Sequence, residues 1–306
     1  QFLCNLHNSS DAQISHVLRL KYRARLQVHA GIVHKVLAGS APKMQAMKIA
    51  TWNVNSLTAR LQHVLDWLAV NPVDVLALQE LKLTDDKFPH QALREAGYEA
   101  AVFGQKTYNG VALLTRAPLT ADDVVRNIPG FADESARVIA ATVPAPGGPL
   151  RVVNGYFVNG QAPGSDKFDY KMSWLRALRD WLREELAAHP RLLLLGDFNI
   201  APEDRDSHDP VGLAETIHHT SEERHHFQAL LGLGLADAFR LFEQPDKSFS
   251  WWDYRMLGYQ KNRGLRIDHI LVSEPLRAQV AACGIDRVPR KWPKPSDHAP
   301  VTLELV

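Results

Sequence analysis

The chain alternates short apolar runs, typical of buried strands, with stretches in which apolar residues recur at helical spacing. Helical spacing is found over residues 57–68 and 174–186. The apolar runs predict strands at residues 49–52, 73–78, 111–114, 138–143, 152–156, 192–195, 267–272 and 301–305. Because strands and helices are interleaved and no internal repeat is present, the pattern predicts one α/β domain.

The most informative apolar run is the one at residues 192–195, which leads directly into Gly196-Asp197-Phe198-Asn199. In an open α/β sheet, functional side chains gather where strands end, because the loops there stand on a rigid base. Asp197 and Asn199 are two positions apart, so an extended backbone presents both on one face. A single acid after a strand is more often a turn residue or helix cap, so this segment alone does not establish a site.

Polar side chains also accompany four other predicted strands. They are Asn53 after Trp52, Gln79-Glu80 after Leu78, Asp268 after Ile267, and Ser296-Asp297-His298 before the last strand. If these groups converge, the carboxylates raise one another's pKa unless a cation neutralises them. Oxygen ligands of this kind suit Mg²⁺ or Mn²⁺ and not zinc. A metal ion with carboxylates and one histidine can catalyse nucleophilic displacement at phosphorus.

Each of these residues, taken alone, also has a structural explanation. Glu80 is consistent with a surface acid at a strand end, and Asp268 with a partner of Arg266 or His269. An isolated histidine such as His298 more often caps a turn than takes part in catalysis. The joint occurrence of such groups at strand ends favours the functional interpretation.

Seven short motifs carry a resemblance to a known family. In chain order they are MKIATWNVN at 47–55, LQELK at 78–82, NGYF at 154–157, GDFNI at 196–200, WWDYR at 251–255, NRGLRID at 262–268 and SDHAP at 296–300. In this order the chain from Met47 to the C-terminus resembles the exonuclease III family. The resemblance implies the endonuclease/exonuclease/phosphatase fold, a four-layer α/β sandwich of two packed mixed β-sheets flanked by helices.

The same resemblance implies a Mg²⁺-dependent DNA phosphodiester hydrolase, with Mn²⁺ able to substitute, that acts in base excision repair. The expected substrate is double-stranded DNA, at 3′ ends, nicks and abasic sites. The expected activities are 3′-5′ exonuclease, 3′-end processing and AP endonuclease activity, carried out by a monomer.

The resemblance also implies the metal site. Glu80 and Asn53 correspond to its ligands, and Asp297 to a further ligand or to a neighbour of the ligands. Some relatives carry an aspartate where this chain has Asn55, so a second metal position is less secure here.

The remaining roles implied by the resemblance concern the reacting groups. Asp197 is expected to orient or deprotonate the attacking water, and Asn199 to hold the scissile phosphate. His298, fixed by Asp268, is expected to contact the phosphate or the developing charge. Tyr156 is expected to face the phosphate or the leaving oxygen.

The WWDYR segment offers flat apolar surface for substrate, together with Leu265 and Ile267. Core packing is an equally good explanation for any one tryptophan. In the family this region lines the pocket for an abasic sugar or a terminal nucleotide, which makes Trp251 the pocket candidate. His218 resembles the bulky residue that a subgroup carries beside that pocket, and it is expected to favour 3′-end trimming over abasic incision.

Basic side chains in the predicted loops are candidates for phosphate contacts. Arg137 and Lys167 are the two assigned to substrate; the wider set is Lys82, Lys106, Arg137, Lys167, Lys171, Arg263, Lys291 and Lys294. A solvated surface explains most such residues equally well, and the salt dependence of DNA affinity separates the two explanations.

Two other patterns favour structural explanations. Residues 217–226 contain four histidines, which suggests zinc, but neighbouring residues on a helix do not face one another. Thr220 and Glu223 form a capping-box pattern that opens a helix over residues 227–231. The Leu-Gly-Leu-Gly-Leu segment at 231–235 lacks a third glycine and follows a helix, so we interpret its glycines as helix-ending.

Composition adds little evidence about partners, because the 35 basic residues are balanced by 34 acidic ones. Six of the basic residues and a single acid, Asp11, lie in residues 1–46. This segment is predicted to be a poorly ordered N-terminal extension, either a targeting leader or sequence outside the natural start, with the catalytic domain at 47–306. Two cysteines and no apolar run of about 20 residues favour a cytoplasmic protein without a membrane span.

Two alternatives stand beside the nuclease hypothesis. A phosphatase or phosphodiesterase of the same fold would act on a small or lipid phosphate, but the tryptophan-rich and NRGLRID motifs favour DNA. A non-catalytic DNA-binding module would lack at least one of the five polar residues at the strand ends. All five are present: Asn53, Glu80, Asp197, Asp268 and His298.

Overall fold

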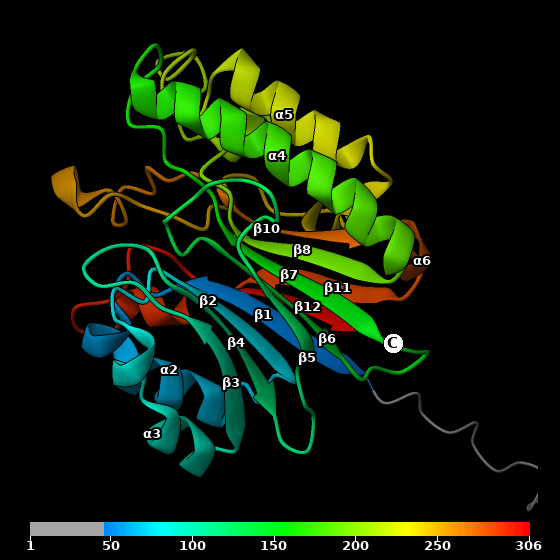
Figure 1. The fold of residues 1–306 in the computed structure, drawn as a ribbon. Helices are drawn as coiled ribbons and strands as arrows, with labels where there is room; N and C mark the ends of the chain where they lie inside the picture. The colour runs from blue at the N-terminus through cyan, green and yellow to red at the C-terminus, as the bar shows by residue number, and fades with distance from the viewer. Residues whose placement is uncertain (1–45) are drawn as a thin grey trace, which may run out of the picture. The chain divides into compact units, whose positions relative to one another are not determined.

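The computed structural model describes residues 46–306 (Figure 1). The predicted extension, residues 1–46, lies outside the described residues apart from Ala46. The domain boundary at residue 47 therefore stays a prediction.

Twelve strands form two six-stranded sheets within the described residues. The first sheet has the strand order β11 (Val280–Ile285), β12 (Val301–Leu305), β1 (Met47–Asn53), β2 (Val75–Gln79), β4 (Val111–Arg116) and β3 (Tyr98–Phe103). The second sheet has the order β5 (Asp122–Arg126), β6 (Val138–Val143), β7 (Leu150–Tyr156), β8 (Leu192–Asp197), β10 (Asp268–Ser273) and β9 (Leu235–Asp237). Both sheets are mixed, since β1 is parallel to β2 and β7 is parallel to β8.

Helices cover the outer face of each sheet, α2 and α3 on the first and α4 and α5 on the second (Figure 1). The helices are α2 (Leu57–Val70), α3 (His90–Glu95), α4 (Asp166–Ala188), α5 (Ser221–Leu231) and α6 (Glu274–Arg277). Short 3₁₀ helices are η1 (Asp85–Lys87), η2 (Asp204–Asp206), η3 (Ala238–Leu241), η4 (Arg255–Leu257) and η5 (Val288–Lys291). None of the helices within residues 46–306 is both long enough and apolar enough to cross a membrane.

Three apolar cores hold these layers together. The central core joins the inner faces of the two sheets through residues such as Ile49, Leu113, Val152 and Leu193, all at most 1% exposed. A second core packs α4 and α5 against the second sheet, and a third packs α2 and α3 against the first. The predicted four-layer α/β sandwich is therefore confirmed.

The structure contains every strand predicted from an apolar run, with ends that shift by no more than two residues. The four strands that sequence patterns missed are β3, β5, β9 and β11, and each one is the edge of a sheet. An edge strand has a neighbour on one side only and buries fewer side chains, so its sequence lacks a continuous apolar run. β5, for example, has no fully buried residue.

The predicted helix start at Thr220 is also confirmed. The Thr220 hydroxyl accepts from the Glu223 amide, and the Glu223 side chain accepts from the Thr220 amide, which is a complete capping box. The helix begins at Ser221, earlier than the predicted residue 227, because this box sits directly at its start. Gly232 caps its end, and Gly234 adopts a φ of +91° in the turn to β9, as expected for helix-ending glycines.

Candidate active site

Strand ends from both sheets meet at one place and bring the predicted polar residues together. Parallel pairing puts Asn53 opposite Gln79 at the ends of β1 and β2, and Tyr156 opposite Asp197 at the ends of β7 and β8. The antiparallel strand β10 begins at Asp268, directly opposite Asp197. The loop that precedes β12 contributes His298, whose neighbour Ser296 donates its hydroxyl to the Asn53 carbonyl.

His298 lies between two buried aspartates. Its Nδ1 is 2.9 Å from Asp268 Oδ2, and its Nε2 is 3.8 Å from Asp197 Oδ2. Asp268 also accepts a 2.7 Å hydrogen bond from the Ser250 hydroxyl, a residue that the sequence did not indicate. Because Asp268 faces Nδ1, it fixes the ring so that Nε2 points toward Asp197.

The combined effect of burial and mutual charge is to raise the pKa values of both Asp197 and His298. Burial raises the pKa of Asp197 to about 7; the nearby carboxylates of Asp268 and Glu80 raise it further and His298 lowers it. Burial alone would lower the pKa of His298, but Asp268 and Asp197 raise it to about 10. The site therefore pairs an imidazolium with a carboxyl group that titrates near neutrality.

A candidate metal site lies beside this pair. Within residues 46–306, Glu80, Asp197 and His298 bring one ligand atom each to within 4.8 Å of one another. Asn53 donates through Nδ2 to Glu80 Oε1 at 2.8 Å and to Asp197 Oδ2 at 2.9 Å. The Lys82 ammonium nitrogen lies 2.9 Å from Glu80 Oε2, the other oxygen of that carboxylate. The oxygens of two neighbouring carboxylates, with an amide, one ammonium and the His298 imidazolium beside them, suit a divalent cation.

Asp297 is placed differently from the other predicted ligands. Its Oδ1 accepts from Asn55 Nδ2 at 2.9 Å, and its Oδ2 accepts from Trp251 Nε1 at 3.0 Å. Burial would raise the pKa of Asp297, but the His298 charge and these two donors hold it below the usual range. Asp297 thus fixes the Trp251 indole, and its role as a metal ligand stays a prediction.

Asn199 lies at the centre of a hydrogen-bond network around Asp197. Its backbone amide donates to Asp197 Oδ1 at 2.9 Å, and its side-chain amide donates to Asp197 Oδ2 at 3.3 Å. Asn159, which the sequence did not single out, donates to Asn199 Oδ1 at 3.1 Å. The only feature of the sequence that could have indicated Asn159 is its position two residues after Phe157 of the NGYF motif. A single amide residue in a loop is too common to indicate a functional site.

Tyr156 faces the same carboxylates. Burial and the charges of Glu80 and Asp197 raise the pKa of its phenol well above the ordinary value, so the group stays protonated and able to donate. The Arg137 guanidinium lies 5.3 Å from the centre of the Tyr156 ring. Arg137 thus reaches the site, whereas Lys167 is exposed in the first turn of α4.

The predicted substrate pocket is an apolar cluster next to His298. Trp251, Leu265 and Ile267 pack together with Ala201 and Leu213. Isolated β-bridges connect Trp251 to both Leu265 and His298, so this apolar cluster adjoins the predicted reacting groups.

His218 borders this cluster. Its ring centre lies 6.5 Å from that of Trp251, and its Nδ1 lies 2.7 Å from the Asn199 carbonyl oxygen. Burial and the charge of Lys171 lower the pKa of His218 to about 3, so the ring is neutral. None of the four histidines of residues 217–226 belongs to the group of potential metal ligands found among the described residues.

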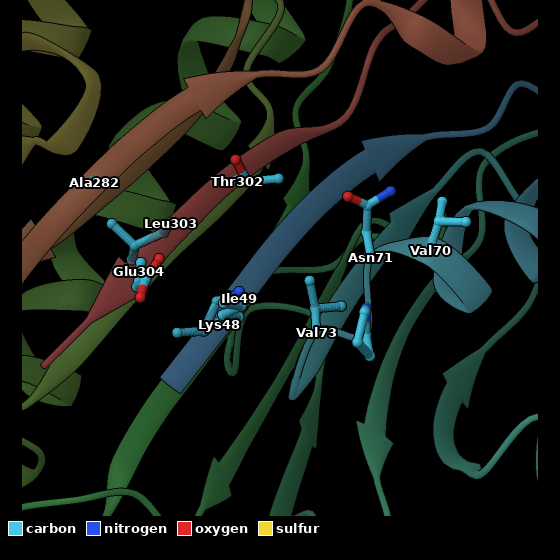
Figure 2. A pocket seen from close by; sticks show the side chains of 10 residues that line it. Lys48, Ile49, Val70, Asn71, Val73, Ala282, Thr302, Leu303 and Glu304 are labelled. Atoms are coloured by element: carbon cyan, nitrogen blue, oxygen red, sulfur yellow. The ribbon is translucent and has the colours of Figure 1, made fainter. Parts of the chain in front are cut away.

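The position of one basic residue, Lys171, differs from the prediction. Lys171 was grouped with the loop bases that contact phosphates, but it is fully buried inside α4 and paired with Glu223. The sequence pattern failed because Lys171 is flanked by polar and aromatic residues that resemble a loop surface. A pocket with a volume of about 200 Å³ lies at the opposite ends of β1 and β2. Lys48, Val73 and Glu304 are among the residues that line it (Figure 2), and none of the residues of the candidate active site does.

A four-layer sandwich whose paired strand ends gather carboxylates, amides and one fixed imidazole is the framework of a metal-dependent phosphoesterase. Comparison with known proteins narrows this class. Residues 50–298 match the sequence model of the Endonuclease/Exonuclease/phosphatase family. The chain therefore belongs to this family, and it is a nuclease of the exonuclease III and AP endonuclease type.

One curated relative and two solved structures, both of NExo, illustrate the similarity. Exodeoxyribonuclease III of Haemophilus influenzae is 36% identical over 275 residues, which cover 85% of this chain and 100% of that protein. The structure of the 3′-5′ exonuclease NExo from Neisseria meningitidis is similar with a TM-score of 0.81 and 49% identity, over 85% of this chain and 99% of that one. The structure of the 3′ phosphatase NExo bound to a product DNA hairpin gives a TM-score of 0.82 with the same identity and coverage.

Proposed function

We propose that this chain is a Mg²⁺-dependent DNA phosphodiester hydrolase that removes nucleotides and blocking groups from the 3′ ends of double-stranded DNA. The observation that carries the proposal is the group of Glu80, Asp197 and His298, which lies between the ends of the two sheets and beside the Trp251 cluster. The two NExo structures, described as those of a 3′-5′ exonuclease and of a 3′ phosphatase and each 49% identical to this chain, support the choice of 3′ ends.

The residues at the site fit a hard divalent cation. Glu80 is the main ligand in this proposal, with Asn53 and Asp197 at its side, and Mn²⁺ can replace Mg²⁺. As a ligand Asn53 would present its amide oxygen, so its side chain would turn from the present arrangement, in which nitrogen faces both carboxylates. A bound cation supplies neutralisation of the carboxylates and polarises the scissile phosphate.

The protein's own groups supply the rest of the reaction. Asp197 orients the attacking water and accepts its proton, and the Asn199 amide positions the phosphate. His298, held by Asp268, offers its Nε2 proton toward the negative charge that develops on phosphorus-bound oxygen. Tyr156 donates from its protonated phenol toward the leaving oxygen.

The pocket accounts for the preference among DNA substrates. Trp251, Leu265 and Ile267 bind the terminal sugar and base, and Arg137 and Lys167 contact the phosphate backbone. His218 narrows the pocket beside Trp251, so abasic incision is the weaker activity. In this proposal the enzyme acts as a monomer.

Two labelled duplexes test the proposal, each with Mg²⁺ and with EDTA. One has a recessed 3′ end, and the other an internal abasic site. The proposal expects metal-dependent shortening of the first and slower incision of the second. Failure to cut either duplex with Mg²⁺ or Mn²⁺, combined with turnover of soluble inositol phosphates, would replace it with the small-phosphate alternative.

A further inference from the structure

A fully buried ion pair next to the active site is not used by the reaction described above. Lys171 of α4 and Glu223 of α5 contact each other, and neither side chain has any exposed surface. Taking both charges out of water is costly, and such a pair stabilises a fold only when further hydrogen bonds satisfy it. The other partners of the two side chains show what the pair holds in place.

Every proton of the Lys171 ammonium has an acceptor. Besides Glu223, Lys171 donates to the Asn199 carbonyl at 2.8 Å and to the Asn159 carbonyl at 3.2 Å. Gly160, with a φ of +87°, leaves room for this side chain, because a Cβ there would lie 2.9 Å from Lys171 Cδ. The loop after Tyr156 is thus shaped around the lysine.

Glu223 holds the opposite side. Its Oε1 accepts from the His218 backbone amide at 3.1 Å, and its Oε2 accepts from the Thr220 amide at 3.1 Å and hydroxyl at 2.9 Å. One carboxylate therefore caps α5 and also fixes the loop that carries His218. The capping box alone requires only the contacts to Thr220.

The two residues held in this way are both in the left-handed backbone region. Asn199 has a φ of 51° and His218 a φ of 72°. Non-glycine residues adopt this conformation at a cost, and they keep it only where surrounding contacts enforce it. A carbonyl only accepts, so His218 Nδ1 must carry the proton in its contact with Asn199, and the neutral ring leaves Nε2 as an acceptor.

We propose that the Lys171–Glu223 pair is a positioning device that holds Asn199 and His218 in their left-handed conformations and thereby sets which DNA lesions the pocket accepts. The pair acts through Asn199 and His218 and does not touch substrate. Without it, the His218 ring loses its fixed tautomer and its place beside Trp251, and the pocket widens. The consequence for DNA rests on the proposed function; the consequence for His218 does not.

The first experiment compares Glu223→Ala with Glu185→Ala. Glu185 forms another ion pair of α4, with Arg151 at 2.6 Å, and it contacts neither Asn199 nor His218. The ratio of abasic incision to 3′-end removal is expected to rise on the order of tenfold or more in Glu223→Ala, because small displacements of positioning groups have large kinetic effects. Glu185→Ala is expected to leave the ratio unchanged. A folded Glu223→Ala protein with the wild-type ratio overturns the proposal.

The second experiment determines the tautomer of the His218 ring by ¹⁵N NMR in the absence of DNA. The wild-type ring is expected to be the Nδ1-protonated tautomer, and the Glu223→Ala ring a mixture. A single unchanged tautomer in the variant overturns the positioning role. A wild-type protein that shows the fixed tautomer but cuts no DNA refutes the proposed function and leaves the positioning role standing.

A double variant covers the case in which Glu223→Ala does not fold. Lys171→Met combined with Glu223→Gln removes both charges without leaving either one unpaired. The Asn199 carbonyl then loses its ammonium donor, so the same mixed tautomer and the same rise in abasic incision are expected. A folded double variant that matches the wild type in both measurements counts against the proposal.

Discussion

His298 Nδ1 lies 2.9 Å from Asp268 Oδ2, so the only direction left for the other ring nitrogen is toward Asp197. Asp268→Asn would keep the size of this partner and remove its charge. We expect kcat for 3′-end removal to fall by about a hundredfold or more, since positioned acid–base groups contribute at least that much. Ser250→Ala serves as the control, because it removes a neutral donor to Asp268, together with the acceptor of the Ile267 and Asp268 backbone amides, and leaves the Asp268 charge in place. A smaller loss in Asp268→Asn than in Ser250→Ala would exclude Asp268 as the partner that activates His298.

The pH dependence of stability in the metal-free protein follows from two raised pKa values. Asp197 has a pKa of about 7 in the folded protein against an ordinary 3.8, so its protonation favours the fold at low pH and this contribution is lost as pH rises to 7. His298 has a pKa of about 10 against 6.5, so its contribution is complete below pH 6.5 and is lost as pH rises through 10.

The Asp197 contribution declines between pH 3.8 and 7 and the His298 contribution between pH 6.5 and 10, so the Tm of the metal-free protein should decline across both ranges. Thermal unfolding in EDTA measures this decline, and His298→Asn should flatten its upper part, between pH 6.5 and 10. Added Mg²⁺ should raise the Tm more at pH 8 than at pH 6, because the cation binds the ionised carboxylates. Equal stabilisation by Mg²⁺ at the two pH values would contradict the assignment of Asp197 to the cation site.

Measurements of Mg²⁺ affinity should show whether Glu80 or Asp297 contributes more to metal binding. Glu80→Gln is expected to weaken Mg²⁺ binding by about 10- to 100-fold or more, as loss of a group that holds or orients a metal generally does. Asp297→Asn should weaken it less, because both Asp297 oxygens already accept from Asn55 and Trp251. Titration calorimetry of both variants measures this difference, and equal losses would establish Asp297 as a ligand of similar weight.

The pocket hypothesis predicts a gain of activity. His218→Gly removes the ring beside Trp251 and should raise abasic incision by about tenfold or more, within the range by which pocket contacts discriminate substrates. His219→Gly is the matched control, since its ring contacts the Ile217 carbonyl. Unchanged abasic incision in His218→Gly would remove steric exclusion as the reason for a preference for 3′ ends.

Phosphate contacts should be visible in the salt dependence of DNA affinity. Arg137→Ala is expected to weaken binding and to reduce the slope of log affinity against log salt by about 1. Lys167→Ala tests the exposed residue in the same way, although the structure places only Arg137 against Tyr156. Binding titrations at several salt concentrations provide both slopes, and a slope equal to that of the wild type would show that the residue contacts no phosphate.

Interior strands and the main polar residues of the site were predictable because each depends on local sequence. A strand buried on both faces needs a continuous apolar run, and the site residues follow directly at its end, as Asp197 follows Leu192–Leu195. The edge strands were not predictable from apolar runs, since they bury little. Lys171 was misplaced for a related reason: its burial depends on Glu223 and on two backbone carbonyls that lie far away in the chain or in loops.

The order and spacing of the motifs were sufficient to identify the strand ends and the family, and they predicted which polar residues come together at the candidate site. Which of these polar residues contact one another is decided by the packing of the two sheets. Asp268 and His298 are 30 residues apart, and Asn53 and Asp197 are 144 residues apart, yet each pair forms a hydrogen bond. Contacts at such separations depend on how the sheets and helices pack against one another, and no local pattern encodes them. For that reason the charge balance around Asp197, the anchoring of Trp251 by Asp297 and the buried pair behind His218 became visible only in three dimensions.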